Sequence, residues 1–208
     1  MAGRTRVRPA ADLGLTDTVR CRRSRRSFSL YRLDFASELV FAGDAGTTFA
    51  GRPSRRTGIE FSNDDKPADG LTVDADVAFA PARFRGFDPA GDRIPGAVEG
   101  VASIALAVDR IGACFGALQL RHFGPRLLFE DNRVRSAATA TLNGRIGWRI
   151  DRSSRIELEG SNLTNRRDLA IDYRYESRLR NESVAVGDVH FHPIEPGSFH
   201  VTFITRFD

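Results

Sequence analysis

The chain has 208 residues, of which 41% are hydrophobic and 28% are charged, and its formal net charge is +4. That length suits one domain of ordinary size, and no stretch approaches the roughly 18 consecutive apolar residues that a transmembrane helix needs. A membrane-spanning strand needs only about 10 residues of alternating character, so the mean hydropathy of −0.31 does not exclude a membrane β-barrel.

The positive charge is concentrated at the start of the chain. Residues 1–26 hold eight arginines and two aspartates, which gives this segment a charge of +6 and leaves −2 for the remainder. Such an arm can bind nucleic acid or anionic lipid, but it has no interleaved aromatic residues and no nucleic-acid motif. We therefore expect residues 1–27 to form a disordered basic leader and expect no nucleic-acid partner. No apolar core of a secretory signal follows Met1.

Strand-like alternation dominates from residue 28 onward. In the clearest case, Leu71, Val73, Ala75, Val77 and Phe79 alternate with polar or small residues. Helical spacing fits none of the segments as well. The sequence predicts an all-β, antiparallel up-and-down meander of about eight long strands, at 28–41, 57–63, 71–82, 97–109, 114–123, 138–150, 155–163 and 196–207.

The gaps between these segments alternate in length. Those at 42–56, 84–96, 124–137 and 164–195 are long, whereas those at 64–70, 110–112 and 151–154 are shorter. Successive connections of a meander lie at opposite ends, so all long loops are predicted at one end. Outer-membrane barrels show this asymmetry, with short periplasmic turns and long extracellular loops.

One face of the predicted strands is charged and the other is nearly free of charge. In a membrane barrel the charged face lines a wet lumen and the apolar face meets lipid, whereas in a soluble barrel the charged face is solvated. A 14-residue strand at 28–41 exceeds the roughly 5–6 residues common in soluble sheets and favours the membrane. The predicted lumenal residues are Asp34, Glu38, Glu60, Asp74, Asp76, Glu99, Gln119, Arg121, Asn143, Arg145, Arg149, Glu157 and Glu159.

Four stretches carry a family resemblance. SELVFAGDAGTTFAGRPSRRTGIEFSN (37–63) and GDRIPGAVEGVASIAL (91–106) resemble late barrel strands of bacterial TonB-dependent outer-membrane receptors. LEGSNLTNRRDLAIDYRYESRL (158–179) is similar to their penultimate strand, with an Asn-Leu-x-Asn signature at 162–165. DVHFHPIEPGSFHVTFITRF (188–207) is similar to a closing strand. The resemblance covers about residues 28–208, the C-terminal part of the receptor barrel.

The resemblance implies a barrel of about 22 strands filled by a plug domain and energised through the TonB protein. It implies uptake of iron–siderophore complexes, haem or cobalamin across the outer membrane. The chain is then expected to be a fragment that lacks the signal peptide, the TonB box, the plug and the early strands. Its expected partners are outer-membrane lipid, the rest of the barrel, the plug and TonB, and we expect it to aggregate when expressed alone.

Few residues suggest chemistry. His190 and His192 share a strand face near Asp188, but two histidines without a third ligand are a weak metal signal. In the longest loop, five residues could contact a ligand or only order the loop: Asp172, Tyr173, Tyr175, Glu176 and Arg178. No catalytic arrangement or phosphate loop is visible. We therefore expect no enzyme and no catalytic, cofactor or metal site.

Two other hypotheses remain open at this stage. A self-contained eight-stranded outer-membrane barrel, acting as an anchor or small binding protein, would require segment 28–41 to pair with 196–207. A soluble β-sandwich could instead bind nucleic acid through its basic arm, with a steep salt dependence.

Overall fold

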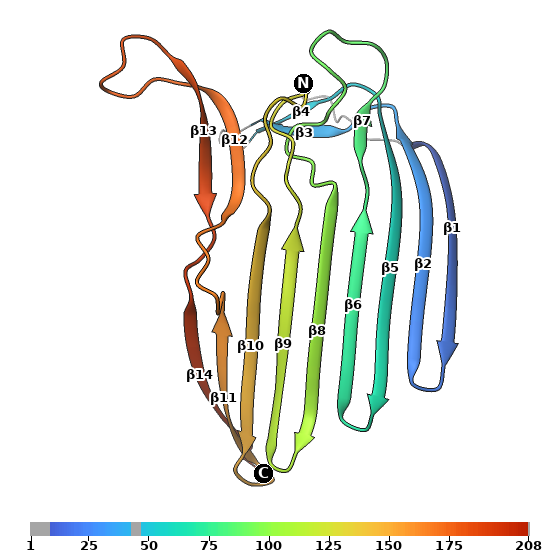
Figure 1. Ribbon diagram of the computed structural model, residues 1–208, viewed down its shortest axis with the longest axis vertical. Coiled ribbons are helices and arrows are strands. Elements are labelled where there is room, and N and C mark those ends of the chain that lie inside the picture. Colours follow the sequence, from blue (N-terminus) through green and yellow to red (C-terminus); the bar gives the residue numbers. More distant parts are fainter. Residues whose placement is uncertain (1–8, 43–46, 208) are drawn as a thin grey trace.

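The computed structural model describes residues 9–42 and 47–207, and in them the chain is all-β. Its main sheet follows the order β1-β2-β5-β6-β8-β9-β10-β11-β14, with β7 also paired to β5 (Figure 1). The strands are β1 (Pro9–Cys21), β2 (Ser24–Phe35), β3 (Leu39–Ala42), β4 (Thr47–Ala50), β5 (Ser54–Ala68), β6 (Leu71–Phe79), β7 (Ala82–Phe84), β8 (Gly100–Ile111), β9 (Cys114–Phe123), β10 (Thr139–Arg149), β11 (Ser154–Ser161), β12 (Leu169–Ser177), β13 (Val186–Pro193) and β14 (Ser198–Thr205). Every pairing is antiparallel, which confirms the predicted meander.

The first strand of the sheet was not predicted. Residues 9–21 form β1 and pair with β2 along its length, from Pro9 opposite Phe35 to Cys21 opposite Ser24. The expected disordered leader of residues 1–27 is therefore wrong for its described part, and its boundary falls inside β2. The alternation is weak here, because only Leu13, Leu15 and Val19 are apolar and Asp17 interrupts their face. The arginines that follow also make the segment read as a basic arm.

The long connections contain hairpins of their own. The predicted 14-residue strand at 28–41 is divided, because the chain leaves the sheet at residues 36–38 and β3 pairs with β4 instead. The closing segment 188–207 is also divided. Its first part is β13, which pairs with β12 in a separate two-stranded sheet, and its second part is β14. Pro193 and Pro196 interrupt the segment because proline offers no N–H to a ladder.

Short and long connections lie at opposite ends of the sheet, as predicted (Figure 1). The turns at 22–23, 69–70, 112–113 and 150–153 form the turn end. Four long loops form the other end: loop 1 (36–53), loop 2 (80–99), loop 3 (124–138) and loop 4 (162–197). Two turns depend on glycine, because Gly70 and Gly112 have φ values of 77° and 65°.

The two faces of the sheet differ sharply. One face carries a cross-strand row of Ala75, Ile104, Leu120 and Leu142, and we call it the outer face. The opposite, inner face carries the row of Asp76, Ser103, Arg121 and Thr141. Large apolar side chains of the outer face are exposed: Leu13, Leu15, Val19, Phe28, Leu30, Ile59, Phe61, Val77, Phe79, Ile104, Leu106, Leu118, Leu120, Ile146, Trp148, Ile156, Leu158, Phe199, Val201 and Phe203.

The buried apolar side chains gather at the loop end instead. Ala82 and Phe84 lie on the inner face and are buried with Val40 and Ile94. Leu127 and Leu128 of loop 3 are buried as well. At the loop end, the inner face of the sheet therefore packs against the loops.

This arrangement corrects one predicted face. Asp34 was assigned to the lumen with Glu60, but the pairings of β2 and β5 place it on the outer face with Leu30. Leu33 and Phe35 occupy the inner face. The pattern of polarity inverts at the loop end because the inner side there meets the buried cluster rather than water.

The two alternative architectures are also wrong for the described residues. β2 lies between β1 and β5, and β14 pairs with β11, so the strands at 28–41 and 196–207 do not close an eight-stranded barrel. No second sheet covers the outer face within this part of the chain, as a β-sandwich would require. The described residues contain no helix that is long and apolar enough to cross a membrane.

The β10–β11 turn provides a pH-dependent element outside the sheet. Asp151 accepts hydrogen bonds from the Ser153 and Ser154 N–H groups and from the Ser153 hydroxyl, at 2.7, 2.8 and 2.9 Å. The Ser153 N–H is the main cause of a lowered pKa of Asp151, because it stabilises the carboxylate form.

A carboxyl whose pKa is lower in the folded than in the unfolded chain stabilises the fold above its unfolded pKa. That contribution is lost as the pH falls below about 3.8, through the lower folded value. We expect the turn to loosen in that range, as reported by the fluorescence of Trp148 nearby. In the Asp151→Asn variant this step should be absent, and an unchanged step would contradict the assignment.

Candidate functional site

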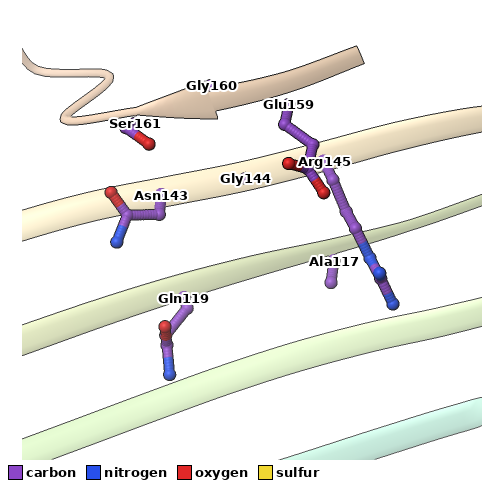
Figure 2. A pocket seen from close by; sticks show the side chains of 8 residues that line it. All are labelled: Ala117, Gln119, Asn143, Gly144, Arg145, Glu159, Gly160 and Ser161. Carbon is purple, nitrogen blue, oxygen red and sulfur yellow. The ribbon is translucent and has the colours of Figure 1, made fainter. Parts of the chain in front are cut away.

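Polar side chains line a shallow hollow on the inner face (Figure 2). Gln119 of β9, Asn143 and Arg145 of β10, and Glu159 and Ser161 of β11 surround a volume of about 210 Å³. They converge because Gln119 lies opposite Asn143 and Arg145 opposite Glu159 in the antiparallel register. This surface offers donors and acceptors to a polar partner on the inner side.

An aromatic residue lies beside this surface on the inner face, toward the turn end. The ring of Phe115 covers Gly147, where an added Cβ would approach within 2.1 Å of the ring. The Arg149 guanidinium lies 4.6 Å from the ring centre and the Arg155 guanidinium 5.9 Å. These contacts fix two inner-face cations near the turn end.

At the other end, ion pairs join the four long loops in sequence. Arg52 of loop 1 pairs with Asp88 of loop 2 at 2.9 Å and with Glu130 of loop 3. Glu99 of loop 2 accepts Arg135 of loop 3 at 3.4 Å. These ion pairs therefore connect loops 1, 2 and 3 to one another.

Loop 4 is attached by a buried ion pair. Arg126 of loop 3 donates to Asp172 of β12 at 3.2 Å, and the two side chains are only 12% and 2% exposed. Arg174 of the same strand lies over the ring of Phe129, 5.0 Å from its centre. Thr139 of β10 also donates to the Leu169 carbonyl at 2.7 Å. The β12–β13 hairpin is thereby anchored to loop 3 and β10.

All four loops contribute to a second hollow of about 330 Å³, which we call the loop hollow. Phe49, Phe129 and Tyr173 supply aromatic surface, and Arg174 supplies a cation. The acids in its wall, Glu130 and Asp172, are engaged by Arg52 and Arg126. Such a mixture suits an organic ligand with aromatic and anionic groups. The remaining lining residues are Val40, Pro95, Gly96 and Leu128.

The residues that sequence reasoning singled out separate into two groups. Asp172 and Tyr173 line the loop hollow. Tyr175 instead stacks on His190, with ring centres 3.9 Å apart, and Arg178 donates to the Glu182 carbonyl. Glu176 is exposed on the same strand as Tyr175.

The histidine pair lies on β13 rather than on the last strand. His190 is opposite Tyr173 and His192 opposite Ile171, so both rings share one face of the hairpin with Tyr173 and Tyr175. The rings of His192 and Tyr173 meet edge to face, 6.2 Å apart. In residues 9–42 and 47–207, no group of three His, Cys, Asp or Glu side chains is placed to hold a metal ion.

Several residues of the loop hollow were not anticipated. Phe49, Phe129 and Glu130 come from loops 1 and 3, far from Tyr173 in sequence. A hint was present in the FED run at 129–131, where an aromatic stands beside two acids inside a long gap. Nothing in the pattern indicated that this run meets loop 4.

No protein-family model matches the chain. Comparison with solved structures finds the ferric yersiniabactin uptake receptor FyuA from Yersinia pestis, with a TM-score of 0.71 and 21% identity over 94% of this chain and 30% of that one. The ferric-catecholate import receptor Fiu from E. coli K12 gives 0.68 and 19%, over 94% of this chain and 27% of that one. The copper transporter OprC gives 0.63 and 15%, over 93% and 31%.

The described sheet thus has the fold of one section of a β-barrel receptor wall. This confirms the resemblance to TonB-dependent receptors at the level of the fold. The chain spans about 27–31% of the length of these structures.

Proposed function

We propose that the chain forms part of the wall of a TonB-dependent receptor in the bacterial outer membrane. The observation that carries this proposal is the broad, exposed apolar outer face between short turns at one end and long loops at the other. Soluble proteins rarely expose a contiguous apolar surface of this extent, whereas lipid requires one. In this orientation the turns are periplasmic and the loops are extracellular.

The inner face and the loops suit transport rather than catalysis. The hollow around Gln119, Asn143 and Glu159 would meet a plug domain, and the loop hollow would contribute to cargo capture from outside. Its aromatic and cationic side chains favour a ferric siderophore over a bare metal ion. Haem and cobalamin are the other cargoes that the resemblance implies, and TonB would supply the coupling to energy.

A fluorescence test uses two adjacent residues on opposite faces. In a Trp148→Phe background, which removes the only tryptophan, Leu120→Trp and Gln119→Trp place one indole on each face. The chain is refolded into phosphatidylcholine vesicles whose acyl chains carry bromine. We expect strong quenching at position 120 and little at position 119, because bromine quenches only an indole in contact with lipid.

Equal quenching at both positions would show that the chain does not insert as a two-faced wall. A monodisperse, soluble product without vesicle binding would contradict the proposal outright. In that second case the apolar outer face would need a protein partner instead of lipid.

A further inference from the structure

Arginines border the apolar outer face at the loop end of β2, β5 and β7. Leu30, Ile59 and Phe79 form one cross-strand row of this face. Four residues further along the strands lies the row of Asp34, Arg55 and Arg83. β7 keeps the register of β6 against β5, so Arg83 stands on the same face as Phe79. We call Arg32, Arg55, Arg83 and Arg85 the rim arginines.

One carboxylate organises three of them. Asp34 accepts the Nε of Arg55 at 2.7 Å and the Nε of Arg32 at 3.1 Å, and the Arg85 guanidinium lies 3.8 Å away. The Asp34 side chain is only 11% exposed, whereas the three arginines are much more accessible. Arg83 is held in a similar way by Glu99 at 2.9 Å.

The distance from the apolar surface matches a lipid headgroup. Four residues of strand span about 13 Å, which a tilt near 45° reduces to roughly 9 Å of depth. The headgroup region of a bilayer starts at the edge of the hydrocarbon core. A row that lies roughly 9 Å further from the bilayer centre than the last apolar row therefore falls among the headgroups. The rim arginines would therefore stand beside the headgroups of the leaflet on the loop side.

Their chemistry selects a phosphate. Three guanidinium groups around Asp34 and a fourth on Arg83 give the rim an excess of positive charge. Asp34 accepts from the Nε atoms of Arg32 and Arg55, which leaves their terminal nitrogens for a ligand. Guanidinium groups bind phosphate oxygens through paired N–H donors, and a fixed array loses little entropy on binding. Here the ion pairs to the largely buried Asp34 hold the arginines in place.

We propose that the rim arginines form a binding site for the phosphate groups of phosphorylated lipids in the outer leaflet. The inference rests on the proposed function, because only a membrane wall places this surface among headgroups. The site lies on the outer face and is separate from the loop hollow and from the inner face.

The test uses the full chain and vesicles of defined composition. One set is phosphatidylcholine with roughly one lipid in five replaced by lipid A, a bisphosphorylated glucosamine lipid, and a second set carries phosphatidylglycerol at equal surface charge. The emission shift of Trp148 reports insertion, and titration with vesicles gives the apparent affinity. We expect tighter binding to the lipid A vesicles than to the phosphatidylglycerol vesicles.

Matched variants locate the effect. The triple variant Arg32→Gln, Arg55→Gln, Arg85→Gln should lose about tenfold in affinity for lipid A vesicles and no longer distinguish the two sets. A control triple, Arg22→Gln, Arg110→Gln, Arg152→Gln, removes the same charge from exposed turn-end positions and should keep the preference. The corresponding lysine triple at the rim keeps the charge but not the paired donors, and should fall between the wild type and the glutamine triple.

Two outcomes would overturn the inference: the preference persists in the rim triple, or it disappears equally in the turn-end triple. Should the glutamine triple not insert, an undiminished preference in the lysine triple would overturn it as well. If Trp148 shows no shift with any vesicle, including pure phosphatidylcholine, then the proposed membrane role fails and the lipid site fails with it.

Discussion

Replacing Ile104 by arginine is expected to destabilise the inserted chain by about 2–4 kcal/mol, the cost of a charge facing the middle of a bilayer. Ile104 lies on the outer face between Ala75 and Leu120, and 52% of its surface is exposed. A soluble protein tolerates a charge at such a position within about 0.5 kcal/mol. Urea unfolding of vesicle-inserted chain, followed through Trp148, measures the difference.

The matched control is the next residue along β8. Ala105 faces the inner side and lies opposite Asp74 and Gln119. An arginine there gains a carboxylate neighbour and stays in a wet environment, so Ala105→Arg should be nearly neutral. Equal costs at 104 and 105 would mean that neither face meets lipid.

Replacing Arg126 by methionine is expected to detach the β12–β13 hairpin from the rest of the loop end. The change leaves Asp172 buried without its cation, a situation that costs about 3–5 kcal/mol. The main sheet shares no backbone ladder with this hairpin, so the loss should be local. Hydrogen exchange should accelerate in β12 and β13 and remain unchanged in β8 to β10.

Two variants separate this effect from a simple loss of charge. Arg133, in the same loop, pairs with Asp131, but its side chain is 84% exposed, so Arg133→Met should leave exchange unchanged. The double variant Arg126→Met, Asp172→Leu removes both charges and should restore protection. Slow exchange in the Arg126→Met hairpin would show that the ion pair does not hold it.

The fold was largely predictable from the sequence because its main signal is local. Alternation along residues 71–79 gives β6 directly, and the gap lengths give the two ends. β1 was missed because only three apolar residues alternate within an arginine-rich segment. The predicted face of Asp34 was wrong because the two faces exchange polarity at the loop end. There the inner face is apolar and packs against the buried cluster, and the outer face carries the charges.

The site was less predictable because it depends on contacts between distant loops. Asp172 and Tyr173 were recognised as loop residues, but their neighbours Phe49 and Phe129 follow from tertiary packing. The hairpins β3–β4 and β12–β13 lie inside the predicted long gaps. The length of these gaps indicated at which end the loops lie, but their residue pattern did not indicate a hairpin. Periodicity identifies a strand, but it does not reveal which loop meets another loop.

The chain of ion pairs from loop 1 through loop 4 has a consequence for the affinity of any ligand that binds at the loop end. Loops that are ordered in advance lose little conformational entropy when a ligand arrives, so more of the contact energy remains as affinity. The coupling also means that movement of one loop is transmitted to its neighbours through Arg52 and Arg126. The four loops would therefore respond as a unit, because one loop cannot shift without straining an ion pair to the next.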